Sequence, residues 1–323
     1  MKIYVANVPQ ASTVDEPTNR GSGYCGVTAC LLEGLKQLGF AVTAAHDGLH
    51  VYQTGQLHEQ YDLYVVQRSM QHDQSTVFRE LEKWGILGRT AFIDGFDYVF
   101  GPDYFWLKSP VAYFQKENLG RHPVHTLPFG IEDRFIRDGR RIPAHGRANA
   151  RVMFAHRYQT HADRPVILRM LQEAGMDVVW RRIEDPPETR GPVYWQTGGR
   201  HNASYYGALD TCRVGVAAEG EAVDTLRYWE FAASGAVLVS PRVEQIITGF
   251  PDPPTPGVHY VPYDGPEEVV DAVRTAIDRY DEVIEAQREF FLSHHRSVHR
   301  AKRLLSIMAE RANAIVEPAT ACG

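Results

Sequence analysis

The sequence predicts an α/β fold made of two domains, each a parallel sheet covered by helices. Short apolar runs alternate with helix-spaced apolar patterns along the chain. The length of 323 residues suits two domains of about 150 residues each. A polar stretch without periodicity, residues 137–150, contains Pro143 and divides the halves as a linker. We therefore expect domains over residues 1–145 and 150–290, and a C-terminal helix in 291–323 that returns to the first domain.

In the first half, apolar runs at 2–7, 41–45, 61–67 and 89–94 predict four strands. Helical spacing predicts one helix over 29–38 and another over 75–84. Gly21, Gly23 and Gly26 precede the first helix, and a strand, glycine loop, helix and strand open a Rossmann-like domain. These glycines lie well beyond the first strand, so they are weak evidence for a bound dinucleotide.

Acidic residues close the fourth predicted strand, which ends at Asp94 and is followed by Asp97. The carboxyl ends of parallel strands form the usual ligand crevice of an open α/β sheet. Asp94 is therefore a candidate catalytic carboxylate. Turn and helix-cap chemistry is an equally good explanation of both acids.

In the second half, apolar runs at 151–155, 176–180, 213–218, 236–240 and 259–263 predict five strands. Helices are expected over 164–174, 204–209, 264–280 and 281–314, and residues 184–200 are expected to form a loop. The pattern of strand, loop, helix and strand over 213–240 is the crossover that parallel strands require.

The crossover helix is predicted from its ends and its apolar face. Asp224 and Thr225 stand where an N-cap belongs, and Gly235 is placed to end the helix in a left-handed cap. The apolar face is expected to contain Leu226, Trp229, Ala232 and Ala233. The helix N-terminus would then offer unpaired N–H groups to a phosphate.

Arg227 and Glu230 lie three residues apart on this helix, so both can project from one side. An arginine suits a diphosphate, and a carboxylate suits sugar hydroxyls. The alternative is an ion pair on the protein surface.

The segment DTLRYWEFAASGAVLVS, residues 224–240, resembles the donor-site segment of GT-B glycosyltransferases of the retaining group 1 type. Glu230, Ala233, Gly235 and Val237 match that motif in order, and the R-Y-W-E form resembles a subset related to spore-maturation-type glycosyltransferases. The resemblance implies two Rossmann-like domains facing each other across a cleft. It also implies that Glu230 binds the ribose of a nucleotide-sugar.

The sequence departs from the family motif at Ala222, where a second Glu is usual. Glu219, Glu221 or Asp224 could take its place. The resemblance further implies that Arg157 binds the donor pyrophosphate, with His156 in the place of a Gly and Arg164 as a loose substitute for a Lys. Residues 21–26 would approach the donor and the acceptor. The expected donor-binding residues are Gly23, Arg157, Arg164, Asp224, Thr225, Arg227 and Glu230.

The expected function is transfer of a sugar from a nucleotide-sugar to an unidentified acceptor hydroxyl, without metal or further cofactor and with retention. Asp94 would be the base should the enzyme invert. The alternatives are a nucleotide or sugar binder and a nucleotide-sugar epimerase of the same architecture.

Composition and charge limit the other classes. The net charge of −6 disfavours a general nucleic-acid binder, although the Arg-rich segment 134–200 leaves a modified nucleic acid among the acceptors, beside a glycan or small molecule. Four cysteines without metal-like spacing, and no apolar run of membrane-spanning length, favour the cytoplasm. His295 and His299 lie four apart, but the sequence lacks the acid of a zinc motif, so no metal site is expected.

Overall fold

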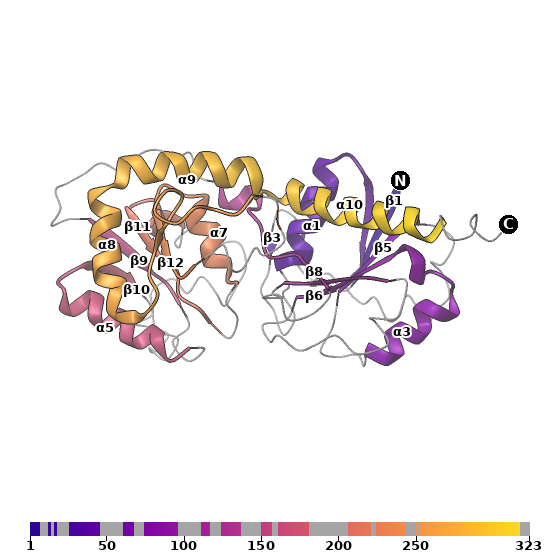
Figure 1. The fold of residues 1–323 in the computed structure, drawn as a ribbon, viewed down its shortest axis with the longest axis horizontal. Coiled ribbons are helices and arrows are strands. Elements are labelled where there is room, and N and C mark those ends of the chain that lie inside the picture. The colour runs from indigo at the N-terminus through magenta and orange to yellow at the C-terminus, as the bar shows by residue number, and fades with distance from the viewer. Residues whose placement is uncertain are drawn as a thin grey trace. The chain divides into compact units, whose positions relative to one another are not determined.

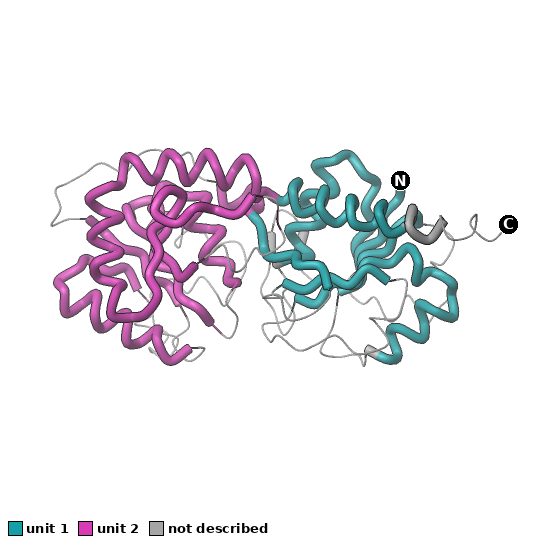
Figure 2. Tube along the Cα trace, viewed as in Figure 1, with its two compact units in different colours: residues 1–130, 297–323 teal, residues 131–296 magenta. Residues whose placement is uncertain are grey.

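The computed structural model describes residues 1–6, 12–13, 16–17, 26–45, 61–67, 74–95, 111–116, 124–136, 150–156, 161–180, 206–220, 224–242, 250 and 252–316. The chain divides into two compact units (Figure 2). Unit 1 contains residues 1–130 and 297–323, and unit 2 contains residues 131–296.

Unit 1 is built on a six-stranded sheet in the order β4-β1-β5-β6-β7-β8. All neighbouring strands in it are parallel. The strands are β1 (Lys2–Ala6), β4 (Ala41–Ala45), β5 (Leu63–Gln67), β6 (Thr90–Asp94), β7 (Ala112–Gln115) and β8 (His125–Thr126). A short antiparallel pair, β2 (Ser12–Thr13) and β3 (Glu16–Pro17), is separate from this sheet.

Helices cover both faces of the unit 1 sheet. Figure 1 shows α1 (Gly26–Gln37) and α10 (Ser297–Val316) on one side and α3 (Gln74–Lys83) on the other. The turn η1 (Leu87–Arg89) directly precedes β6 in the chain. Helices α1 and α10 lie so close together that a Cβ added at Gly34 would stand 2.1 Å from the carbonyl oxygen of Ser297. The last helix of the chain therefore belongs to the core of unit 1.

Unit 2 is built on a second sheet in the order β10-β9-β11-β12-β13, again with parallel neighbours throughout. Its strands are β9 (Arg151–Phe154), β10 (Asp177–Trp180), β11 (Val214–Val216), β12 (Val237–Ser240) and β13 (Val261–Pro262). Both units thus have parallel sheets with helices, and the predicted α/β fold class is confirmed.

Helices cover the unit 2 sheet in the described part of the chain, which also contains the turns η2 (Asp133–Phe135) and η6 (Pro266–Glu268). Helices α5 (Asp163–Glu173) and α8 (Val269–Asp278) share an apolar core with alternate residues of β9, β11 and β12. Helices α7 (Leu226–Ala232) and α9 (Tyr280–His294) contact the strand residues that alternate with these core residues, such as Gly215 and Leu238. The Phe231 ring of α7 lies over Gly215 of β11, where a Cβ would come within 2.5 Å of it. The side chain of Gln287 in α9 accepts a hydrogen bond from the backbone N–H of Leu238 at 2.8 Å.

Two local predictions are wrong. The stretch 281–314 is not one helix, because the backbone leaves the helix at His295 and Arg296 and pairs with Ile131. Gly235 does not have the positive φ of a left-handed cap. Helix α7 ends at Ala232 instead, and the Ser234 hydroxyl closes the turn by donating to Phe231 O and accepting from Ala236 N.

The predicted linker, residues 137–150, lies outside the described residues except for Ala150. None of the helices in the described part of the chain is both long enough and apolar enough to cross a membrane.

Candidate functional site

The strand order of unit 2 places a topological switch point between β9 and β11. From β9 the chain moves outward to β10, then returns to β11 and continues in the opposite direction to β12 and β13. Crossover connections therefore diverge at the carboxyl ends of β9 and β11, which is where open α/β sheets bind ligands. Ala155 and His156 follow β9 at this edge, and Ala217 to Glu219 follow β11.

Two arginines are held against the backbone at this edge. Arg164 of α5 is 5% exposed, and its Nη2 donates to the carbonyl oxygen of Ala218 at 3.1 Å. Arg227 of α7 donates from Nε to the carbonyl oxygen of Ala155 at 3.0 Å. The two guanidinium groups, from separate helices, thus bracket the ends of β9 and β11.

Glu230 is hydrogen-bonded to Arg227, one of these two arginines. Its carboxylate accepts a short hydrogen bond from Nη1 of Arg227, and a second at 3.3 Å from the hydroxyl of Tyr206. The side chains of Arg227 and Glu230 are only 19% and 7% exposed. Their predicted placement on one side of a helix is therefore confirmed. The ion pair of the alternative interpretation is also present, but it is largely buried rather than exposed at the surface.

Tyr206 lies in a helical turn of residues 206–209, within the helix expected over 204–209. Burial, followed by the nearby charge of Glu230, raises the pKa of its hydroxyl well above the ordinary value. Tyr206 therefore stays protonated and can only donate to a carboxylate. Nothing in the sequence links it to Glu230, 24 residues further along.

His156 is buried at the same edge. Burial, Arg164 and Arg227 all lower its pKa well below 6.5, so the ring is neutral at pH 7. Its Nε2 lies 2.8 Å from the carbonyl oxygen of Val216, which requires the proton on Nε2. The bond joins β9 to β11 just beyond their last paired residues. The neutral histidine adds no charge at this edge, so Arg164 and Arg227 are the groups there that can bind an anion.

The loop before α7 differs from the expected cap. Thr225 is the N-cap residue as predicted, but its side chain makes no cap bond, and its buried hydroxyl oxygen has no hydrogen-bond partner among the described residues. Asp224 is 1% exposed and accepts a hydrogen bond from the indole of Trp229 at 2.8 Å. Helix α7 has only seven residues, so its dipole is a minor contribution. The arginines are the groups expected to bind an anion here.

Asp94 lies in unit 1, at the carboxyl end of β6 as expected. It is 2% exposed and accepts a hydrogen bond from the hydroxyl of Tyr113 at 2.8 Å. Gln115 pairs with it in the neighbouring strand β7, and the buried Lys116 follows. A group of buried polar side chains therefore gathers at this edge of the first sheet.

Several predicted positions cannot be placed. Gly23 and Arg157 lie outside the described residues, as do Ala222 and Glu221.

His295, one of the two histidines with helical spacing, has a structural role. Its Nε2 is hydrogen-bonded at 3.0 Å to the carbonyl oxygen of Asp252. In the part of the chain that the structure describes, no three His, Cys, Asp or Glu side chains gather as metal ligands would.

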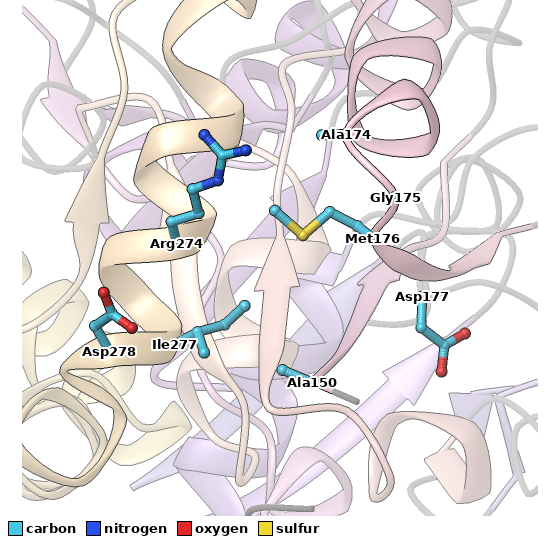
Figure 3. A pocket seen from close by; sticks show the side chains of 8 residues that line it. All are labelled: Ala150, Ala174, Gly175, Met176, Asp177, Arg274, Ile277 and Asp278. Atoms are coloured by element: carbon cyan, nitrogen blue, oxygen red, sulfur yellow. The ribbon is translucent and has the colours of Figure 1, made fainter. Parts of the chain in front are cut away.

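A pocket of about 350 Å³ opens at the opposite, amino-terminal edge of the unit 2 sheet (Figure 3). Met176 and Ile277 provide apolar side chains, and Asp177, Arg274 and Asp278 provide charges. Asp177 is paired with Arg151 at 3.0 Å, and Arg274 bonds Asp271 at 3.0 Å. The pocket is thus separate from the arginines that bracket β9 and β11.

Comparison with protein families finds a match that lies mostly in the second unit. Residues 180–306 match the model of a family described as glycosyl transferase-like. This match includes Tyr206, Arg227 and Glu230. No curated protein matches the chain.

Among solved structures, 24 chains match this one. One is the pneumococcal O-GlcNAc transferase GtfA in complex with UDP and GlcNAc, which is 12% identical with a TM-score of 0.45. The alignment covers 81% of this chain and 60% of that chain. The present chain thus spans under two thirds of that protein's length.

Proposed function

We propose that the protein is a glycosyltransferase that moves a sugar from a nucleotide-sugar to an acceptor hydroxyl, and that unit 2 binds the donor. The observation that carries this proposal is the group formed by Arg164, Arg227 and Glu230 at the switch point between β9 and β11. The family match over residues 180–306 supports the same class of reaction.

Each part of the site has a task in this reaction. The arginines would bind the diphosphate and stabilise the charge that develops on it as it leaves, which makes a metal ion unnecessary. Glu230 would accept hydrogen bonds from the ribose hydroxyls. The buried hydroxyl of Thr225, at the start of α7, is a proposed further contact. Arg157 and Gly23 are also proposed donor contacts, on the motif match alone.

Asp94 is a proposed catalytic residue on the acceptor side, because a carboxylate at a strand end can accept a proton from a hydroxyl. Retention is the proposed stereochemistry, on the resemblance of residues 224–240 to the retaining group. The acceptor would be a glycan, a small molecule or a modified nucleic acid. The cytoplasm is the proposed compartment, where the buried Cys30 and Cys212 would stay thiols.

The test is incubation with a panel of nucleotide-sugars, followed by measurement of released nucleoside diphosphate with and without a chelator. We expect release from one donor class, unchanged by the chelator. Binding without release would support a non-catalytic binder, and conversion of the sugar without release would support an epimerase. Activity that is lost with the chelator and restored by Mn²⁺ or Mg²⁺ would show that the arginines alone do not stabilise the leaving group.

A further inference from the structure

The loop from β11 to α7 is held at both of its ends. At its start, Ala217 N donates to Val239 O at 2.8 Å, and the Tyr263 hydroxyl donates to Ala217 O at 2.9 Å. At its end, the Trp229 indole reaches back five residues to the carboxylate of Asp224. The Thr225 side chain makes no cap bond, and the indole–carboxylate bond ties Asp224, at the end of the loop, to helix α7.

Trp229 is also fixed from behind. It is fully buried, and its ring lies 6.2 Å from that of Phe291, edge-on, and 5.7 Å from that of His295. His295 is itself bonded through Nε2 to Asp252 O, and its carbonyl oxygen accepts from Ile131 N at 2.9 Å. The indole therefore has one orientation, which the surrounding structure imposes.

The orientation of Trp229 determines where the next residue points. Glu230 follows it on the same seven-residue helix, and Arg227 precedes it by two positions. A helix this short has few bonds of its own to resist rotation. Fixing the indole therefore fixes the direction in which Arg227 and Glu230 project.

We propose that Asp224 and Trp229 are positioning residues for the donor site, and that Asp224 does not touch the donor. The carboxylate of Asp224 instead accepts the indole N–H and so holds Arg227 and Glu230 in their binding geometry. This inference rests on the proposed function, and it replaces the expected donor contact at Asp224.

The test is a double-mutant cycle with nucleotide affinity and stability as separate measurements. The probe is whichever of uridine, guanosine, adenosine and thymidine diphosphate binds the wild-type chain most tightly in calorimetry. Urea unfolding of each variant gives its stability. The variants are Asp224→Asn, Asp224→Ala, Trp229→Phe and the double variant Asp224→Ala with Trp229→Phe.

Asp224→Asn keeps an oxygen that can accept the indole N–H but removes the charge, so its affinity should stay within about threefold of the wild type. Asp224→Ala and Trp229→Phe each leave one buried partner without its hydrogen bond, and each should weaken binding about fivefold to thirtyfold. The double variant removes both partners and should bind no more weakly than the weaker single variant.

Three results would overturn the inference while nucleotide binding itself remained. Asp224→Asn that binds as weakly as Asp224→Ala would make the carboxylate a donor contact. Additive losses in the double variant would show that the two residues act separately. Lower urea midpoints with unchanged affinity would show that the pair only stabilises the fold. A wild-type chain that binds none of the four nucleotides would overturn the proposed function as well.

Discussion

Replacing Gly215 by alanine should disturb the proposed donor site from inside the core. The new Cβ would stand 2.5 to 2.8 Å from three atoms of the Phe231 ring, which is fully buried. Ring and strand cannot both stay in place at that separation, and overpacking of this kind costs about 1–3 kcal/mol. Because Phe231 follows Glu230 on α7, the helix that carries Arg227 and Glu230 has to move with the ring.

The assay is urea unfolding combined with calorimetric titration of nucleoside diphosphate. We expect Gly215→Ala to lower the free energy of unfolding by about 1–3 kcal/mol and to weaken nucleotide binding. Gly207→Ala is the matched control, because a Cβ at that exposed glycine meets no atom within 4 Å. A Gly215→Ala variant that is as stable as this control and binds nucleotide as well as the wild type would refute the packing argument.

Two further predictions concern charges at the same edge. Arg227→Lys should weaken nucleotide binding about tenfold, because a lysine cannot donate to Ala155 O and Glu230 at once as the planar guanidinium does. Equal affinity in calorimetry would contradict this. His156 has a lowered pKa in the folded chain, so the unfolded chain takes up a proton first as the pH falls below about 6.5. Its stabilising contribution is complete above that pH and declines below it, by at most about 1.4 kcal/mol per pH unit. Urea unfolding from pH 7.5 to 5.5 should therefore show a shallower acid decline for His156→Gln than for the wild type, and parallel curves would contradict it.

The long apolar strands were predictable because buried parallel strands are continuous apolar runs. The strands β7 and β8 were not predicted, although β7 is as long as β9, β10 and β12 and is fully buried. The break between α9 and α10 was also missed. His295 and Arg296 leave the helix to pair with Ile131, more than 160 residues earlier in the chain, and local periodicity contains no such information.

For the proposed donor site, the sequence predicted only what residue spacing and the motif contain. The three-residue separation of Arg227 and Glu230 predicted that they share a side of the helix, but not that the pair is buried. Tyr206 and His156 join the site through tertiary contacts with Glu230 and Val216. The partner of Asp224 could not be foreseen either, because a residue at a helix start usually bonds the backbone of the first turn.

The central claim is that nucleoside diphosphate binds unit 2 against Glu230, and calorimetry on Glu230→Ala tests it most directly. The loss of a charged hydrogen bond should weaken binding by about 1–3 kcal/mol. The control is Glu173→Ala, which removes an exposed carboxylate from the last turn of α5 and should leave the affinity unchanged. If Glu230→Ala binds nucleoside diphosphate as tightly as the control and the wild type do, the donor does not bind where the account places it.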